Sequence, residues 1–224
     1  MQDSSGEKLG MKFKNRSQAG RLLAERLSAY RNRDVIVLAI PMGGVPVGYE
    51  VAMEFNAPLD LVLSKKIGAP FNSELAIGAV TWNGAVMIDQ AMADRWQVSR
   101  EYIGGEARKI MADINRVMND LRVGLGNFPK LYGRTVIIVD DGIATGSTMI
   151  AAVEAIRDQG PKEVVIATPV VPDELVKSLE YVAPLVYVNA PDDFEAVGQY
   201  YEEFETLSDE KVKEFLLLAN KAWI

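Results

Sequence analysis

The residues best suited to chemistry form one short run after an apolar stretch. Val136–Val139 are apolar, two acids follow as Asp140 and Asp141, and a segment rich in glycine and hydroxyl groups comes next. This order predicts a buried strand, a turn and the start of a helix. In an open parallel sheet, ligands bind beyond the carboxyl ends of the strands, which is where this turn would lie.

The glycine- and hydroxyl-rich segment predicts a site for a monophosphate. The free N–H groups and the dipole of a helix N-terminus favour an anion, and glycines let the backbone approach it closely. Three hydroxyl side chains add further donors. The predicted phosphate loop consists of Gly142, Ile143, Ala144, Thr145, Gly146, Ser147 and Thr148.

Two carboxylates beside a bound phosphate would repel it unless they have another purpose. Asp140 and Asp141 are suited to accept hydrogen bonds from sugar hydroxyls, or to contact a hydrated Mg²⁺ indirectly, through ribose hydroxyls or water. With the phosphate loop they predict a receptor for a ribose 5-phosphate. The alternative is an ordinary turn in which the acids cap the helix, but capping does not require two acids, two glycines and three hydroxyl residues.

The composition excludes several kinds of chemistry. The chain has 224 residues and contains neither cysteine nor histidine. Without cysteine there is no disulfide, thiolate nucleophile or zinc ribbon. Without histidine there is no Ser-His-Asp triad and no His-ligated metal site. Any chemistry must therefore use carboxylates, Lys or Arg, hydroxyls, backbone amides or a bound cation.

The elements that would position these residues alternate along the chain. Apolar, β-rich runs alternate with helical patterns, which predicts an α/β, Rossmann-like fold with a mainly parallel sheet and helices on both faces. The length fits a single domain over 1–224. Expected strands cover 35–40, 59–64, 135–140, 163–170 and 184–188, with a hairpin over 77–81 and 85–88. Expected helices cover 15–30, about 45–56, 147–159 and 173–182, and the Gly, Pro, Asn and Ser content of 65–75 predicts a loop.

Two regions differ from this alternation. Residues 89–123 are polar and lack strand patterns, so they predict a short helix and a long one, Val98–Val123, as a helical insertion or partner-facing arm. Residues 190–224 form an acidic C-terminal cap. It ends in an expected helix over Asp209–Asn220, with Ser208 as its N-cap.

The formal charge of −7 is unevenly distributed. Residues 191–214 carry nine acids and two lysines, whereas residues 8–33 carry eight bases and one acid. The basic segment could contact nucleic acid, but the pI of about 4.8 opposes this, so we expect the solvated face of a helix. The first ten residues lack the apolar region of a signal peptide and no apolar run could span a bilayer. We therefore expect a cytoplasmic protein that does not contact a membrane.

The sequence resembles the type I phosphoribosyltransferases. Val136–Thr148 resembles the segment with which these enzymes bind phosphoribosyl pyrophosphate (PRPP), and the resemblance extends from about Phe13 to the last helix. The motifs at 41–47 (PMGGVPV) and 139–146 (VDDGIATG) further resemble one bacterial and archaeal subfamily. The resemblance implies the type I fold, PRPP and a small nitrogenous acceptor as substrates, release of pyrophosphate, and Mg²⁺ as cofactor.

The resemblance also implies roles for residues outside the phosphate loop. The resemblance implies that Pro41, Met42, Gly43 and Gly44 form a pyrophosphate loop and that Lys65 lies beside it. Met42 stands where the subfamily usually has arginine. Implied catalytic residues are Lys66, Asp140 and Asp141, and residues 67–76 resemble the loop that closes over PRPP. The alternatives are a plain strand-to-helix connection at 41–44 and solvated surface lysines.

One position of the phosphate loop bears on the acceptor. In the related 6-oxopurine enzymes an aspartate stands where this chain has Ala144. The resemblance therefore implies that hypoxanthine and guanine are poor acceptors. Aromatic residues at 194, 200 and 201 could stack on a base, but we favour packing of the C-terminal cap.

Three further readings remain open. The chain could be a PRPP-binding regulatory module linked to nucleic acid, with little or no transferase activity. Arg116 and Arg122 match basic positions of the family's arm, and both could equally be helix-surface residues. The arm is also a natural interface for a homodimer.

Overall fold

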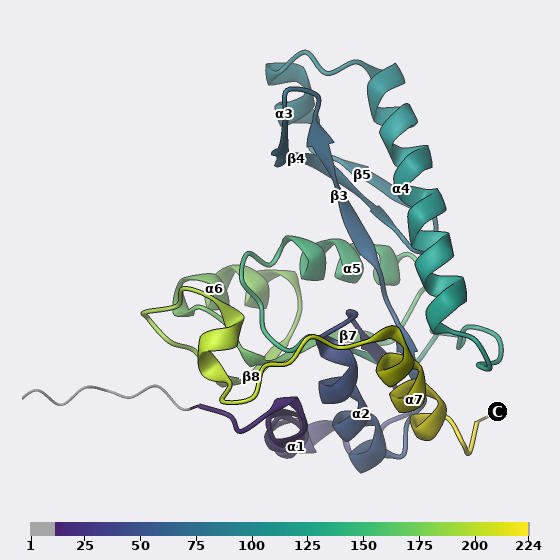
Figure 1. The fold of residues 1–224 in the computed structure, drawn as a ribbon, viewed down its shortest axis with the longest axis vertical. Coiled ribbons are helices and arrows are strands. Elements are labelled where there is room, and N and C mark those ends of the chain that lie inside the picture. The colour runs from purple at the N-terminus through teal and green to yellow at the C-terminus, as the bar shows by residue number, and fades with distance from the viewer. Residues whose placement is uncertain (1–11, 224) are drawn as a thin grey trace, which may run out of the picture.

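A parallel sheet forms the centre of the molecule. A computed structural model describes residues 12–223, and within that range it contains a five-stranded and a three-stranded sheet. The larger, main sheet has the order β2-β1-β6-β7-β8, and every pairing in it is parallel (Figure 1). Its strands are β1 (Val35–Ala39), β2 (Leu59–Leu61), β6 (Thr135–Val139), β7 (Glu163–Val170) and β8 (Leu185–Asn189).

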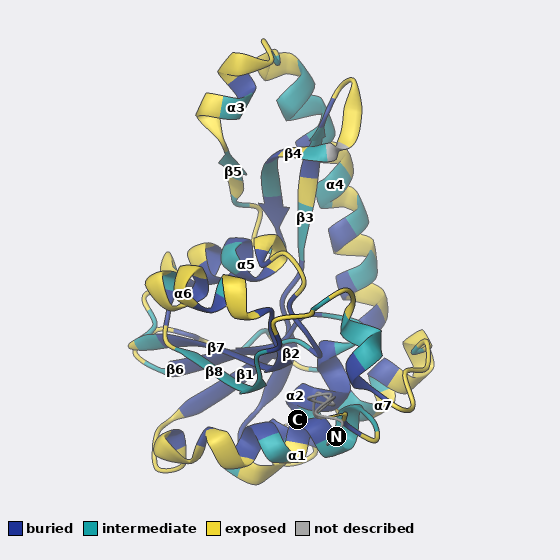
Figure 2. Ribbon diagram, turned by 90° about the vertical axis from the view of Figure 1, so that its left-hand side faces the viewer, coloured by how far each residue is buried: buried dark blue, intermediate teal, exposed yellow. Residues whose placement is uncertain are grey.

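Helices cover both faces of the main sheet, as predicted. Along β1 the alternating side chains enter two different cores, with Val35, Val37 and Ala39 in one and Ile36 and Leu38 in the other. Both faces are apolar because both are buried (Figure 2). The first core is covered by α1 (Arg16–Arg26), α2 (Gly44–Phe55) and α7 (Asp209–Ala219), and the second by α5 (Ser147–Arg157) and α6 (Asp173–Val182).

A second, antiparallel sheet leaves the core after β2. It consists of β3 (Ser64–Ala69), β4 (Asn72–Thr81) and β5 (Val86–Ile88). The predicted hairpin is present as β4 and β5, but the expected loop over 65–75 is wrong, because most of it belongs to β3 and β4. The expected strand over 59–64 is divided in the same way, since β2 ends at Leu61 and Ser64 begins β3.

The reason for this error lies in how glycine and proline are used there. Pro70 and Phe71 alone make the turn between β3 and β4. Gly68 lies at a shift in strand register, and a Cβ on it would lie 2.7 Å from the Cα of Ser73. Glycine at this position therefore marks a β-bulge and a close backbone approach, not a loop.

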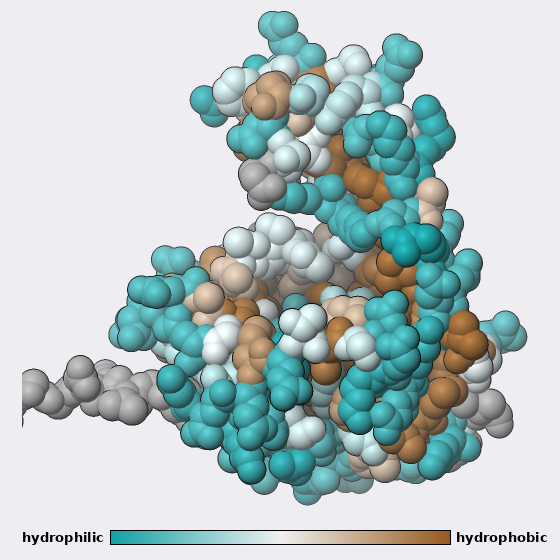
Figure 3. Space-filling view, viewed as in Figure 1, coloured by the Kyte–Doolittle hydropathy of each residue, from teal (hydrophilic) through white to brown (hydrophobic). Residues whose placement is uncertain are grey.

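Two helices pack beside the second sheet. They are α3 (Gln90–Arg95) and α4 (Arg100–Leu121), and α4 buries Ile114 and Leu121. We call residues 64–121 the arm. The arm projects from the core in Figure 1, and the surface is hollowed between the arm and the α5–α6 side of the core in Figure 3.

The start of the described chain lies beside the segment that contains Tyr200 and Tyr201. Phe13 forms a parallel bridge with Tyr201, and the backbone N–H of Phe13 donates to Tyr200 O at 2.8 Å. Tyr200 and Tyr201 are buried, and Phe194 stacks on Tyr200, which agrees with packing of the cap. A short 3-10 helix, Val197–Tyr200, precedes α7, and the Ser208 hydroxyl caps α7 as predicted.

Among residues 12–223, no helix combines the length and the apolar character needed to cross a membrane. The predicted absence of a signal peptide concerns the first ten residues, which lie outside the described residues.

Candidate functional site

The predicted phosphate loop lies between the end of β6 and the first turn of α5. All of its residues except Ser147 line a cavity of about 190 Å³, together with Asp140 and Met149. Gly146 precedes α5 with φ +77°, a conformation that favours glycine. Thr145, Ser147 and Thr148 are exposed. The loop therefore presents hydroxyl groups and the start of a helix to one small cavity.

The N-terminus of α5 is open to a ligand. Side chains cap α1, α3, α4 and α7, namely Asn15, Asp89, Ser99 and Ser208. Among the described residues, no side chain caps α5 or α2, which begin after Gly146 and Gly43. The first N–H groups of a helix have no partner within the helix, so the start of α5 can donate to an anion. At the start of α2, by contrast, the N–H of Gly44 donates to Ile40 O at 3.0 Å, the N–H of Val45 donates to Met42 O at 3.2 Å, and Pro46 has no N–H.

The predicted pyrophosphate loop lies against the acid pair. The peptide bond between Pro41 and Met42 is cis. A Cβ on Gly43 would lie 2.0 Å from Oδ2 of Asp141, and one on Gly44 would lie 2.6 Å from the carbonyl oxygen of Val139. Glycine at both positions is what allows this loop to contact the end of β6.

The two acids have different surroundings. Asp141 is buried, whereas Asp140 is partly exposed and lines the phosphate-loop cavity. The backbone N–H of Asp141 donates to Oδ1 of Asp140 at 2.9 Å. Loss of hydration, together with the neighbouring Asp141 carboxylate, raises the pKa of Asp140 well above its ordinary value. Asp140 is thus the acid that faces the cavity.

Asp141 instead contacts a residue that the sequence did not identify. Nε of Arg16 donates to Oδ2 of Asp141 at 2.7 Å, and each side chain is only 12% exposed. The hydroxyl of Tyr201 donates to the backbone oxygen of Asp141 at 2.6 Å. Arg16 was hidden in the basic segment 8–33, which we interpreted as a solvated helix face. No local pattern links it to an acid 125 residues away.

The two lysines of β3 point to different environments. Lys65 forms an ion pair with Asp113 of α4, which also bonds to Arg116 at 2.5 Å. The contacts with Lys65 and Arg116 lower the pKa of Asp113. Lys66 is exposed, and successive side chains of a strand lie on opposite faces. Lys65 is thus bonded to the helix of the arm, and Lys66 lies on the other face of the strand.

The arm begins beside the phosphate loop. The hydroxyl of Ser64, the first residue of β3, donates to the backbone oxygen of Thr148 at 3.1 Å. The lysine-bearing strand thus starts at the first turn of α5, and movement of the arm would displace its lysines relative to the cavity.

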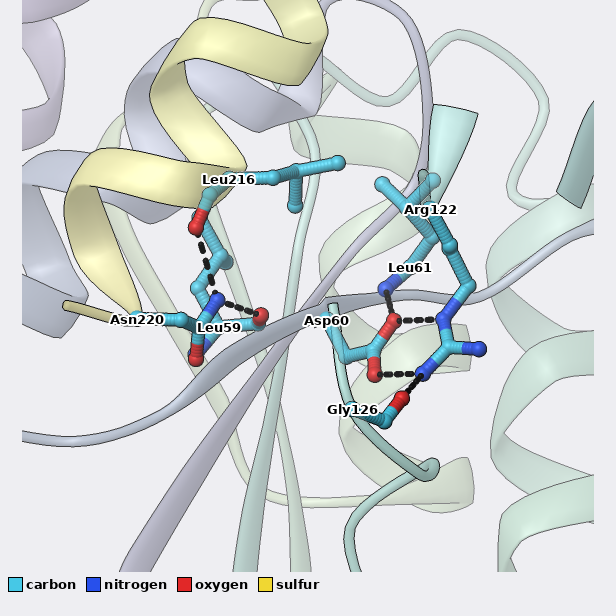
Figure 4. A network of polar contacts seen from close by, with 7 residues as sticks. All are labelled: Leu59, Asp60, Leu61, Arg122, Gly126, Leu216 and Asn220. Atoms are coloured by element: carbon cyan, nitrogen blue, oxygen red, sulfur yellow. Dashed lines mark hydrogen bonds and ion pairs between the residues drawn. The ribbon is translucent and has the colours of Figure 1, made fainter. Parts of the chain in front are cut away.

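Arg122 lies in a structural network away from the acid pair. Its guanidinium makes two bonds to Asp60 of β2, at 2.7 and 2.8 Å, and a third to Gly126 O at 3.2 Å (Figure 4). The Asp60 side chain is 5% exposed. Beside it, the Asn220 side chain bonds to both backbone groups of Leu59 and so covers the open edge of the sheet.

The residues fit a metal only if a substrate brings most of its ligands. Within residues 12–223, no group of three or more acidic side chains is placed to hold a metal ion. One acid of the pair is already bonded to Arg16. Mg²⁺ accepts one or two carboxylates when phosphates and water supply the remaining oxygens, and Asp140 is placed for that kind of contact.

Comparisons with known proteins agree on one family. The sequence model of the phosphoribosyl transferase domain matches residues 14–204. A Mycobacterium tuberculosis protein whose name provisionally describes it as a phosphoribosyl transferase is 39% identical over 210 residues, which are 93% of this chain and 47% of that protein. The chain thus spans about half the length of the curated relatives it matches.

A solved structure matches along nearly its whole length. The crystal structure of a protein from Thermus thermophilus is 38% identical in sequence and superimposes with a TM-score of 0.83. The match covers 93% of this chain and 99% of the Thermus chain.

Proposed function

Since the chain belongs to the phosphoribosyltransferase family and has the type I fold, we propose that it transfers the 5-phosphoribosyl group of PRPP to a nitrogenous acceptor, releasing pyrophosphate. The observation that carries the proposal is the open start of α5 on one side of the acid pair, with the turn at 41–44 packed against Asp141 on the other. The start of α5 suits the 5′-phosphate of PRPP, and the backbone of the turn at 41–44 would contact its diphosphate. Asp140, between them, faces the cavity where the ribose would lie.

The proposed reaction is a displacement at C1′ of the ribose. A nitrogen lone pair of the acceptor forms the new bond to C1′ while the C1′–O bond breaks, and its electrons leave with pyrophosphate. The transition state resembles an oxocarbenium ion, so the protein has to hold geometry and stabilise positive charge. Asp140 and Asp141 would hold the 2′- and 3′-hydroxyls, and no nucleophile from the protein is needed. This agrees with a chain that lacks cysteine and histidine.

The remaining groups would act on the diphosphate. When bound with PRPP, Mg²⁺ would neutralise charge on the leaving group. Met42 brings no charge to the pyrophosphate loop, so the backbone of that loop would carry the contact. Lys66 would reach the diphosphate from the arm, and Lys65 would have to leave Asp113 to do so. Magnesium dependence, cytoplasmic localisation and a homodimer stay predictions.

The central test is pyrophosphate release from PRPP and Mg²⁺ with a panel of bases and amines. We expect release with at least one acceptor, and a loss of about 100-fold or more in Asp140→Asn, because a group aimed at the transition state is removed. Wild-type protein that neither releases pyrophosphate nor is stabilised by PRPP against heat would contradict the proposal.

Ala144 leads to a prediction about the acceptor. With no carboxylate there to handle the purine proton, we expect hypoxanthine and guanine to be turned over at least about 10-fold more slowly than the best of adenine, uracil and orotate. Steady-state rates with each base at saturating PRPP provide the measurement. Rapid turnover of hypoxanthine would show that Ala144 does not decide the acceptor.

The alternative is a PRPP-binding regulator of nucleic acid, favoured by the uncharged Met42. Fluorescence anisotropy with labelled DNA and RNA, with and without PRPP, separates the two functions. We expect no binding at physiological salt, because the chain is acidic overall. PRPP-dependent binding without any transferase activity would favour the regulator.

A further inference from the structure

The ion pair between Arg16 and Asp141 lies where the candidate site meets the N-terminal helix α1 and the segment that contains Phe204 and Glu205. Arg16 is the first residue of α1, and Asp141 follows the last strand residue of β6 by two positions. The guanidinium also donates to Glu205 O at 2.8 Å and lies 4.0 Å from the ring centre of Phe204. Arg16 is therefore fixed by several contacts before it reaches the acid.

Asp141, the partner of Arg16, is also fixed by contacts on both sides. Tyr201, from the same C-terminal segment as Phe204, bonds to the backbone oxygen of Asp141. On its other side, the Asp141 carboxylate lies directly over Gly43. The carboxylate thus occupies a defined position between the N-terminal helix and the predicted pyrophosphate loop.

This position makes the charge of Asp141 important for a polyanionic substrate. The predicted pyrophosphate loop, residues 41–44, contains no charged side chain, and Lys65, the lysine predicted to accompany it, is paired with Asp113. A negative carboxylate beside Gly43 would repel a diphosphate unless a cation compensates it. The cation seen to contact Asp141 is Arg16.

We propose that Arg16 is a positioning residue for PRPP binding, which holds the Asp141 carboxylate toward the ribose hydroxyls and compensates its charge beside the pyrophosphate loop. This inference rests on the proposed function. Arg16 acts through Asp141, while the C-terminal segment, through Phe204 and Glu205, holds Arg16 in place. The N-terminal helix and the C-terminal segment thereby contribute to a site whose acids and phosphate-binding loops follow strands of the main sheet.

The test compares Arg16→Met with Arg21→Met, a matched control. Arg21 lies on the same helix and loses the same charge, but it pairs with Glu50 and its side chain is 59% exposed. We expect Arg16→Met to raise the KM for PRPP about 10-fold and to leave kcat and the acceptor's KM within about threefold of wild type. This pattern is expected when the lost interaction stabilises bound PRPP equally in the ground state and in the transition state. Arg21→Met should match wild type, and Arg16→Lys should recover most of the loss.

A second background tests whether Arg16 acts through Asp141. In Asp141→Asn protein, whose own KM for PRPP is raised, adding Arg16→Met should raise that KM by less than about twofold, because the two residues act as one unit. If Arg16→Met does not fold, Arg16→Lys is compared in the same two backgrounds, with about a threefold effect expected in wild type alone.

The outcomes separate the inference from the proposed function. An active wild-type enzyme in which Arg16→Met lowers only the melting temperature or kcat, with an unchanged KM for PRPP, overturns the inference alone. Equal effects in the wild-type and Asp141→Asn backgrounds also overturn it. A wild-type protein that neither turns over PRPP nor is stabilised by it overturns the proposed function, and the inference with it.

Discussion

Adjacent acids with different environments are a common way for one site to hold two roles. Asp140 lines the cavity with a raised pKa, while Asp141 is buried against Arg16. Environments that separate two titratable neighbours often divide their functions. A carboxyl that is poorly hydrated before substrate binds also destabilises the folded state. Replacing Asp140 should therefore change the stability of the protein as well as its activity.

We therefore expect Asp140→Asn to be more stable than wild type at neutral pH. The folded-state pKa of Asp140 lies above its unfolded value, so the folded protein binds the extra proton, and wild-type stability falls as pH rises through that interval. The variant should melt at least about 2 °C higher near pH 7, and the difference should vanish near pH 4. Calorimetry across this pH range gives the measurement. A variant less stable than wild type at pH 7 would mean that the charged carboxylate is well accommodated.

Gly43 should not tolerate even one methyl group. In Gly43→Ala the new Cβ would meet the Asp141 carboxylate at 2.0 Å, so the pyrophosphate loop or the acid must move. Such overpacking costs about 1–3 kcal/mol, and we expect PRPP binding to weaken by at least about 10-fold. Gly105→Ala in α4 is the control, because a Cβ there meets no atom within 4 Å. PRPP-dependent thermal shifts compare the two, and an unaffected Gly43→Ala would be evidence against this contact.

At the scale of elements, sequence periodicity predicted the buried strands and the helix that follows β6, but it missed features that depend on pairing between segments. The apolar runs of β1 and β6 and the hydroxyl-rich start of α5 were all found in the sequence, because burial and helix ends leave local signals. The β3–β4 hairpin was missed, since Gly68 and Pro70 serve a bulge and a two-residue turn. Arg16 was missed because its partner is distant in the sequence. Long-range contacts leave no such signal.

The base of α4 is fixed to the main sheet by a buried ion pair. Arg122→Met would leave the Asp60 carboxylate buried and without its partner, so we expect a loss of about 3–5 kcal/mol in the free energy of unfolding. The control is Arg116→Met, which removes a surface pair within α4, where the arginine side chain is 66% exposed, and should cost less than about 1 kcal/mol. Urea unfolding measures both. Equal losses would show that the buried Arg122–Asp60 pair stabilises the fold no more than the surface pair does.

At the scale of the whole molecule, two sheets of unequal burial share one chain. Every residue of β1 and β6 is buried, while β5 has no buried residue and α3 buries only Ala93 among the residues described. Near the tip of the arm, Phe71 and Trp96 pack against each other although both are exposed. Opening the outer part of the arm, around β5 and α3, would therefore expose less buried apolar surface than opening the core.

Hydrogen exchange should separate these two parts. We expect amides of β1, β6 and β7 to exchange only through global unfolding, whereas those of β5 and α3 exchange through local opening. Their protection should differ by at least about 100-fold, which mass spectrometry of peptides can resolve. Equal protection of β5 and β6 would mean that arm and core unfold as one unit.

The course of the chain through the main sheet also bears on how it folds. Asp34 and Arg134 bond to each other at the start of β1 and β6, although 100 residues separate them and the arm accounts for much of that interval. The entropy lost on closing such a loop grows only with the logarithm of its length, so halving it would save only about 0.6 kcal/mol. The core thus sets almost no entropic limit on the size of the arm. The interval affects the folding rate instead, because contacts between β1 and β6 are distant in the sequence and raise the contact order. During synthesis β1 can pair with β2 early, but it cannot pair with β6 until the whole arm has been made.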